Sequence, residues 1–496
     1  MTDVIKIHAA DDVAVALAPL ASGTYVPEFG VTLGDDIPQG HKFALHALTP
    51  GARVVKYGAV IGQAVADIAP GRHVHVHNLK TVLGDVLEYS YAGTGEGPAA
   101  AKAKEVPTIL AYERANGEIG IRNELWIIPL VGCINGLAEN IARQVTAANI
   151  LPEGSAARVL SHPYGCSQLG DDLANTRGIL QNFARHPNAG GVLILGLGCE
   201  NNTLPLFKEH LDLPDSARVK FIITQEVGDE MAVSLDACRE LAGLMHADKR
   251  VPVGADRLRI GLKCGGSDGF SGITANPLLG AFSDWLTGLG GTTVLTEVPE
   301  MFGAEQILMA RAENREVFDK TVKLINDFKG YYVANNQPIY ENPSPGNKAG
   351  GISTLEEKSL GCTQKAGRAM VRDVLPYTGH ISKPGLNLLS APGNDGTSVT
   401  ALAACGCHMV LFTTGRGTPL GGIVPTVKVA TNSSLAERKG NWIDFNAGPI
   451  ATGASTVEAM VEPFSEAILA FASGKTTRNE ENGIAEITIF KSGVTL

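Results

Sequence analysis

The stretch Gly191-Val192-Leu193-Ile194-Leu195-Gly196-Leu197-Gly198-Cys199-Glu200-Asn201-Asn202 carries the pattern that decides the fold. A short apolar run is followed at once by a turn of glycine and polar residues. A run of this length between turn signals is typical of a buried strand, and such strands alternate with helices in α/β proteins. The stretch therefore predicts one strand of an α/β layer structure, with a polar loop at its carboxyl end.

The same pattern recurs four more times along the chain. Apolar runs that begin at residues 159, 258, 386 and 409 lead into the loops 164–168, 264–269, 391–395 and 415–419. Loops at the carboxyl ends of strands line the ligand crevice in α/β sheets. We therefore expect these five loops to form the functional site.

The first ninety residues have a different pattern. Short β-type runs such as residues 54–58 and 73–77 are separated by Gly, Pro and Asp turns, which predicts a small all-β module. The small-residue-rich segment between residues 91 and 107 is typical of a tether, and a weaker division falls at residues 248–256. We expect three domains, over residues 1–92, 106–250 and 255–496.

Composition restricts the possible partners and the compartment. The net charge of -10 and the lack of Lys/Arg runs argue against a nucleic-acid partner, and no apolar run approaches the length of a membrane span. The first residues lack the features of a secretion signal. Eight cysteines in 496 residues are too few for a disulfide scaffold. We expect a cytoplasmic protein with reduced thiols. We also expect it to form a homo-oligomer, a dimer.

Six of the twelve histidines lie within the first eighty residues. In an extended strand His73, His75 and His77 would project from one face, where imidazoles can share a metal with a ligand from another strand. His41 is the candidate for that other ligand. We therefore predict His41, His75 and His77 as metal ligands, with an exposed histidine face as the alternative.

Three cysteines offer a second way to hold a metal. Cys166, Cys199 and Cys362 each follow a glycine and precede polar residues in a turn. If they converge, they could bind a soft metal or three corners of an iron-sulfur cluster. Burial as small core residues is the competing interpretation.

Several motifs in this order resemble the altronate dehydratase family, which is related to the galactarate dehydratases and the sulfolactate sulfo-lyases. The resemblance runs essentially end to end. It rests on residues 40–45, 56–58, 73–78, 120–126 (Gly-Ile-Arg-Asn-Glu-Leu-Trp), 164–172, 265–269, 340–348 (Tyr-Glu-Asn-Pro-Ser-Pro-Gly-Asn-Lys) and 490–496.

The resemblance implies an N-terminal β-clip module of the SAF type, followed by two layered α/β domains of the Rossmann kind. It also implies dehydration of D-altronate to 2-dehydro-3-deoxy-D-gluconate in hexuronate catabolism, with Fe²⁺ as the cofactor and Mn²⁺ as a substitute. Dehydration of another hexonate or hexarate, an iron-sulfur hydro-lyase and a non-catalytic sugar-acid sensor remain alternatives.

Dehydration of a sugar acid requires groups that grip the carboxylate and a base that removes the neighbouring proton. Arg122, Lys365 and Arg416 are the candidates for orienting the anion, because a cation pairs with a carboxylate. Lys42, Asp172 and Glu200 are the candidates for the base.

Overall fold

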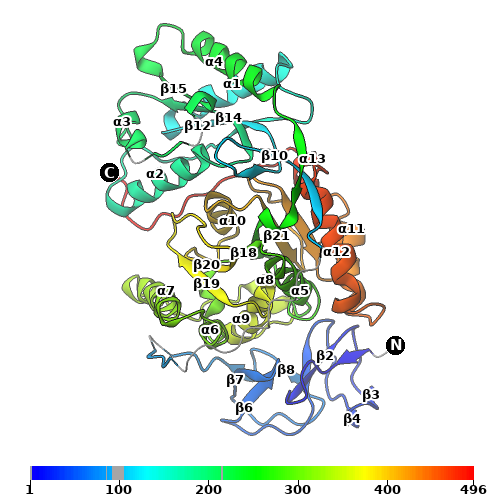
Figure 1. The fold of residues 1–496 in the computed structure, drawn as a ribbon. Helices are drawn as coiled ribbons and strands as arrows, with labels where there is room; N and C mark the ends of the chain where they lie inside the picture. The colour runs from blue at the N-terminus through cyan, green and yellow to red at the C-terminus, as the bar shows by residue number, and fades with distance from the viewer. Residues whose placement is uncertain (1–2, 85–86, 92–104, 210, 214–215) are drawn as a thin grey trace.

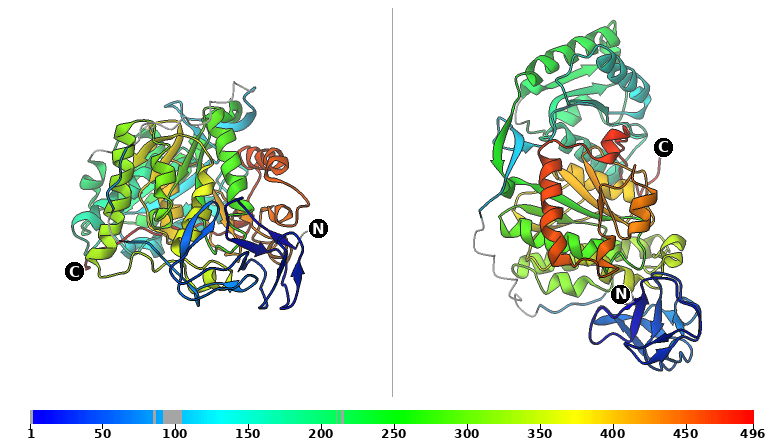
Figure 2. Two further views of the ribbon diagram at one scale, coloured as in Figure 1. Left: turned by 90° about the horizontal axis from the view of Figure 1, so that it is seen from below. Right: turned by 90° about the vertical axis from the view of Figure 1, so that its right-hand side faces the viewer.

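The computed structural model describes residues 3–84, 87–91, 105–209, 211–213 and 216–496. The all-β N-terminal module lies at one end of an elongated molecule, the α/β unit of residues 255–496 lies in the centre, and the unit that follows β10 lies at the other end (Figures 1 and 2). The predicted tether between residues 91 and 107 falls largely outside the described residues. In the described part of the chain, no helix is long and apolar enough to cross a membrane.

Short strands separated by tight turns build the N-terminal module. They form sheets in the orders β1-β2-β5-β8, β6-β7-β9 and β3-β4. Buried apolar side chains such as Val13, Val54 and Ile61 fill its interior. The strands are β1 (Val4–Ile5), β2 (Val13–Ala16), β3 (Tyr25–Val26), β4 (Val31–Thr32), β5 (Lys42–Ala44), β6 (Arg53–Lys56), β7 (Ala59–Ala64), β8 (His73–Val74) and β9 (Leu79–Lys80).

The middle unit is a parallel sheet in the order β13-β12-β14-β15. One face of the sheet packs against α1 and α4, and α2 lies between the other face and α10 of the next unit. Its elements are β12 (Glu124–Pro129), η1 (Gly132–Ile134), α1 (Asn135–Ala147), β13 (Ala157–Val159), α2 (Gly170–Ala184), β14 (Ala189–Gly196), α3 (Leu204–Lys208), η2 (Ser216–Arg218), β15 (Val219–Ile223), η3 (Thr224–Glu226) and α4 (Glu230–Met245).

A small antiparallel sheet connects the middle unit to the C-terminal unit. Its order is β11-β10-β16, formed by β10 (Thr108–Glu113), β11 (Ile119–Gly120) and β16 (Arg250–Gly254). The weak division predicted at residues 248–256 therefore includes a strand that pairs back with the start of the middle unit.

The C-terminal unit is a seven-stranded parallel sheet in the order β19-β20-β18-β17-β21-β22-β23. Its strands are β17 (Arg259–Cys264), β18 (Thr292–Leu295), β19 (Val371–Leu375), β20 (Gly385–Leu389), β21 (Met409–Thr414), β22 (Thr426–Ala430) and β23 (Phe445–Asn446). Its helices are η4 (Ala255–Arg257), α5 (Ala275–Gly288), η5 (Val298–Met301), α6 (Glu305–Met309), α7 (Arg315–Ala334), α8 (Pro345–Ala349), α9 (Leu355–Thr363), η6 (Gln364–Ala366), α10 (Asp395–Ala404), α11 (Ser433–Arg438), η7 (Gly448–Ile450), α12 (Val457–Ala472) and α13 (Arg478–Glu481).

All five predicted strand-and-loop units form strands at nearly the expected residues, but they are divided between two sheets. The loops at residues 164–168 and 196–202 follow β13 and β14 of the middle sheet, while the other three follow β17, β20 and β21. The expectation of one site lined by all five loops is therefore corrected, because two separate parallel sheets have two separate carboxyl edges.

Glycines let the N-terminal module approach the C-terminal unit at backbone distance. A Cβ atom on Gly269 would lie 2.0 Å from the carbonyl oxygen of Gly40, and one on Gly351 would lie 2.3 Å from the same oxygen. Gly351 also has a φ of 102°, which other residues rarely adopt. This close seam brings the histidine-bearing strands against α8 and α9.

Candidate functional site

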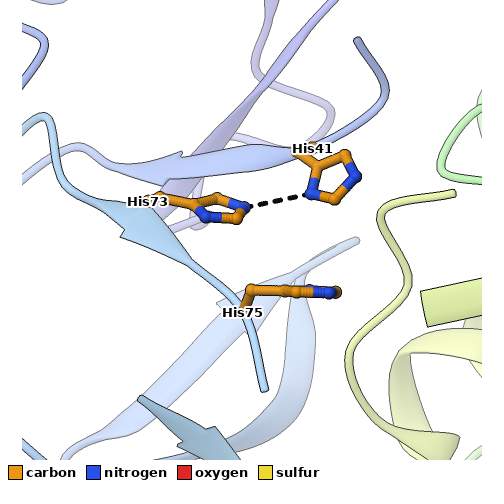
Figure 3. A group of neighbouring side chains, drawn as sticks. All are labelled: His41, His73 and His75. Atoms are coloured by element: carbon orange, nitrogen blue, oxygen red, sulfur yellow. Dashed lines mark hydrogen bonds between the residues drawn. The ribbon is translucent and has the colours of Figure 1, made fainter. Parts of the chain in front are cut away.

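Three histidines gather where the N-terminal module meets the C-terminal unit. His41 precedes β5, His73 begins β8, and these strands pair so that Phe43 lies opposite His73. The Nδ1 atom of His41 lies 3.0 Å from the Nε2 atom of His73. One ring nitrogen from each of His41, His73 and His75 lies within 4.8 Å of the others, and the three rings face a common space (Figure 3).

These imidazoles are neutral at neutral pH. Burial, followed by the charges of neighbouring cations and histidines, lowers the pKa of His73 to about 4 and that of His75 to about 3. Burial also lowers the pKa of His41. A neutral imidazole keeps a lone pair for a metal, and imidazole nitrogens suit iron and zinc. The donor set therefore fits a divalent transition metal.

His77 does not belong to this group. The expected strand over residues 73–77 ends at Val74, because the backbone N–H of Asn78 donates to the carbonyl of His75 and its Oδ1 accepts from the His75 N–H. This turn leaves His77 exposed, with its ring centre 5.5 Å from that of His73. The structure thus brings His41 and His75 together with His73, rather than with His77.

A buried network of charged side chains lies next to the histidines and contacts His75 through Ser353. The Nζ atom of Lys42 donates to Ser353 Oγ at 2.5 Å and to Glu357 Oε2 at 2.8 Å. Lys56 Nζ donates to the other oxygen of Glu357 at 2.7 Å, and His75 Nδ1 lies 3.0 Å from Ser353 Oγ. Two ammonium groups share one carboxylate, so one positive charge is left beside the histidines. An anionic substrate requires such a charge.

The electrostatics of this network follow from its burial. Although burial opposes ionisation, Lys42 and Lys56 hold the pKa of Glu357 at about 2, so its carboxylate stays charged. Burial lowers the pKa of Lys42 to about 8 against the attraction of Glu357. Of the three bases predicted from the sequence, Lys42 is therefore the one that lies beside the histidine group.

A cavity of about 1180 Å³ opens at the carboxyl edge of the seven-stranded sheet. It is lined by the loops that follow β17, β20 and β21 and by α8. Its charged walls include the Lys358–Glu300 ion pair, with 2.9 Å between Nζ and Oε1, and the exposed side chain of Arg416. Asn342, Asn394 and Asp395 add polar groups that could bind hydroxyls.

Helix α8 lies between the histidine group and this cavity. The carbonyl oxygen of Ala349, its last residue, lies 3.3 Å from His41 Nε2. Asn347, in the same helix, lines the cavity and accepts a hydrogen bond from Lys358. The two features are therefore adjacent parts of one region.

Lys365 lies behind the cavity rather than in it. Its Nζ pairs with Glu297 Oε2 at 2.7 Å, and its side chain is fully buried. Arg416, in contrast, lies between two glycines and lines the cavity.

Three other predicted residues are bonded to structural partners and do not line this cavity. Arg122 binds both carboxylate oxygens of Glu480 and the carbonyls of Phe471 and Lys475. Asp172 accepts the backbone N–H groups of residues 492 and 493, and Glu200 accepts those of residues 197 and 198. Each of the three groups thus holds the chain in place.

The structure does not gather Cys166, Cys199 and Cys362. Cys166 and Cys199 are exposed on loops of the middle unit. Cys362 is buried in α9, where its thiol donates to Glu300 Oε2 at 3.1 Å. Among the described residues, the histidine group is the one set of three or more such ligands that lies within reach of a single ion.

Sequence reasoning missed Glu357, Ser353, Lys358 and Glu300. Glu356-Glu357-Lys358 is usually the pattern of a solvated helix face, but α9 is buried along its whole length. The Lys56-Tyr57-Gly58 motif was the one available signal of this network. A lysine that is buried in a β module requires an acidic partner, and that partner is Glu357.

Comparison with known proteins gives matches along the whole chain. Three family models match: "Altronate/galactarate dehydratase SAF domain" over residues 2–82, "D-galactarate dehydratase/Altronate hydrolase, second domain" over residues 111–247, and "D-galactarate/Altronate dehydratase, C-terminal" over residues 255–495.

Similar full-length proteins are also found. The altronate dehydratase of Escherichia coli (strain K12) is 56% identical over 99% of both chains, and that of Bacillus subtilis (strain 168) is 54% identical over 100% of both. The galactarate dehydratase (L-threo-forming) of Escherichia coli (strain K12) is 33% identical over 95% of this chain and 93% of its own length.

Proposed function

Since the chain belongs to the altronate and galactarate dehydratase family, we propose that it is a hydro-lyase that dehydrates D-altronate to 2-dehydro-3-deoxy-D-gluconate and water. Identity above 50% to two altronate dehydratases, against 33% to a galactarate dehydratase, favours the hexonate over the hexarate. The observation that supports a site at the seam is the group of three neutral histidines beside the buried network of Lys42, Lys56 and Glu357.

The reaction has two chemical requirements. Removal of the proton from C2 places negative charge on the adjacent carboxylate, and departure of the C3 hydroxyl as water requires a Lewis acid or a proton donor. The resulting enol then becomes the 2-keto acid by taking up a proton at C3. Both requirements favour a positive environment.

The proposal includes a divalent metal, Fe²⁺ with Mn²⁺ as a substitute, held by His41, His73 and His75. When bound, such an ion supplies a Lewis acid for oxygen ligands. Ser353 bridges Lys42 and His75, so it fixes both side chains toward the seam. Lys42 is the proposed base, because a pKa lowered to about 8 lets its neutral amine form and take up the C2 proton, which places a positive charge beside the carboxylate. Arg416 is the cation proposed to orient the sugar acid from the cavity.

The proposal also includes a Rossmann-like layering of both α/β units, a cytoplasmic location and a homodimer. The two parallel sheets have the strand orders 2-1-3-4 and 3-4-2-1-5-6-7 by sequence position, which supports a Rossmann-like layering in each unit. The described cysteines are free, in keeping with a reducing cytoplasm. A homodimer remains a prediction.

A substrate panel tests the activity. The full chain, loaded with Fe²⁺ under reducing conditions, is incubated with altronate, other hexonates and hexarates, and the 2-keto-3-deoxy acid is measured. Altronate should give the highest kcat/KM. If no sugar acid yields a keto acid, the proposed function is wrong.

A single variant tests the site. His75→Ala should remove iron binding and activity while the circular dichroism spectrum stays unchanged. Full activity with normal metal content would overturn the assignment of the histidines.

A further inference from the structure

Three exposed cysteines lie at the carboxyl edge of the middle sheet, each directly after a glycine. Cys133 follows β12, Cys166 follows β13 and Cys199 follows β14. These strands are neighbours and parallel, in the order β13-β12-β14, so their carboxyl ends lie side by side. We propose that Cys133, Cys166 and Cys199 bind an iron-sulfur cluster at this edge.

Hydrogen bonds tie the three loops to one another in a closed ring. The Gly132 N–H donates to Tyr164 O at 2.8 Å, which joins the first loop to the second. The Asn202 N–H donates to Gly165 O at 3.0 Å, which joins the second loop to the third. The Asn202 side-chain amide donates to Leu130 O at 3.4 Å and closes the ring. Each cysteine lies within three residues of such a bond.

The loops also pack closely enough to require glycine. A Cβ atom on Gly165 would lie 2.0 Å from Leu130 O, and its φ of 96° is in the left-handed region. The position before Cys166 is thus fixed by direct backbone contact with the loop that carries Cys133.

Two helices begin next to the cysteine loops. Helix α1 begins two residues after Cys133, without a side-chain cap and without an acidic residue in its first turn. Helix α2 begins four residues after Cys166, also without a side-chain cap, but its first turn carries Asp171 and Asp172, so α1 is the helix whose N-terminus offers uncompensated N–H groups. Free N–H groups at a helix N-terminus stabilise negative charge within the first turn.

The three cysteines are not arranged around a single ion. A mononuclear site needs its ligands around one atom, but the three sulfur atoms do not all lie within 4.8 Å of one another in the described residues. A cluster binds each thiolate through a different iron, so it accepts more widely spaced ligands. Exposure of all three cysteines also argues against simple packing, since structural cysteines are among the most buried residues.

This site is separate from the proposed histidine site and does not rest on the proposed function. The proposed set contains Cys133 in place of Cys362 of the set predicted from the sequence. Cys133 was overlooked because it is followed by the apolar Ile134 rather than by a polar residue. The backbone N–H of Leu496 donates to Ser167 O at 3.0 Å, so the C-terminal segment also reaches this edge.

The experiment measures cluster content in the full chain. The protein is purified without oxygen and reconstituted with Fe²⁺ and sulfide. Iron, acid-labile sulfide, visible absorption and the electron paramagnetic resonance spectrum of the reduced sample are then recorded. We expect about four iron and about four sulfide per chain, with broad absorption near 400 nm, as a cubane cluster gives.

Variants assign the ligands. Cys133→Ser, Cys166→Ser and Cys199→Ser should each lower sulfide content several-fold, while the matched control Cys238→Ser, a buried thiol of α4 on the same sheet, should retain it. His73→Ala should retain the cluster as well, which separates this site from the histidine group. The proposal would be overturned if the reconstituted protein contained no sulfide or bound only zinc. It would also be overturned if the triple cysteine variant kept the cluster spectrum.

Discussion

Lys42 and Glu357 form a fully buried ion pair, 2.8 Å between Nζ and Oε2, although one belongs to the N-terminal β module and the other to α9. Both side chains are 1% exposed, and Lys56 shares the same carboxylate. A buried charge without its partner costs far more than the pair itself contributes. This ion pair therefore joins the module to the C-terminal unit through two buried charges, each of which requires the other.

Removing the shared carboxylate should destabilise this seam. Glu357→Gln leaves two ammonium groups buried without a counter-charge, which should lower the free energy of unfolding by about 3 to 5 kcal/mol. Urea unfolding measures the effect. The neighbour Glu356→Gln is the matched control, because Glu356 accepts hydrogen bonds from Thr81 and Val82 and pairs with no lysine. Equal losses in both variants would show that charge compensation is not the cause.

The third histidine can be assigned by comparing two variants. His73→Ala should lower the affinity for Fe²⁺ about tenfold or more, because His73 lies in the group with His41 and His75. His77→Ala should leave the affinity unchanged, since its exposed ring lies outside that group. Calorimetric titration with metal measures both. The reverse order would restore the ligand set predicted from strand periodicity.

Strand periodicity predicted the histidine group only in part, for a physical reason. The alternation of residues 73, 75 and 77 holds only while the chain stays extended, and Asn78 ends the strand by bonding back to residues 73 and 75. An asparagine that caps its own upstream backbone is a turn signal. Read in this way, the sequence could have excluded His77.

The strands of the two α/β units were predictable because their apolar runs are continuous and bounded by glycine. The assignment of those strands to two sheets was not, since neighbouring strands are chosen by long-range packing. The structural roles of Arg122 and Asp172 were not predictable either, because their partners lie 358 and 320 residues away in the chain. Glu200 differs, since it accepts a backbone N–H only 3 residues away, a local turn contact.

Acid should destabilise the protein partly through His186. Its Nε2 lies 3.2 Å from Cys407 O, and its Nδ1 accepts the Asn188 N–H. Burial lowers its pKa to about 3. Between pH 6.5 and that value the unfolded chain binds a proton that the folded chain does not, so stability falls as pH falls below 6.5. The loss from this group is about 1.4 kcal/mol per pH unit.

The slope can be measured by urea unfolding between pH 5 and 8. Below pH 6.5 the free energy of unfolding should decline less steeply in His186→Asn than in the parent protein. Above pH 7 the two slopes should agree, because His186 is then neutral in both the folded and the unfolded chain. Equal slopes throughout would mean that His186 is protonated in the folded protein.

The C-terminal segment should depend on Asp172. Its carboxylate accepts the backbone N–H groups of Ser492 and Gly493 at 2.9 and 2.7 Å, and Phe490 of the same segment lines the cavity. Asp172→Asn should raise KM a few-fold through a looser cavity wall and leave kcat within about threefold, since lost hydrogen bonds to a charged group cost about 1.5 to 3 kcal/mol. A loss of kcat by several orders of magnitude would instead identify Asp172 as the base.

Arg416 and Arg122 should respond differently to the same substitution. Arg416 is exposed in the cavity, so Arg416→Met should raise the KM for the sugar acid about tenfold or more, the effect of one lost charge-assisted bond, and leave the melting temperature unchanged. Arg122 is held by Glu480 and three backbone carbonyls, so Arg122→Met should lower the melting temperature and leave the KM of the folded enzyme unchanged. Steady-state kinetics and thermal unfolding of both variants measure this contrast. A normal KM in Arg416→Met would place the carboxylate of the substrate away from the cavity, against the lysine charge at the histidine seam.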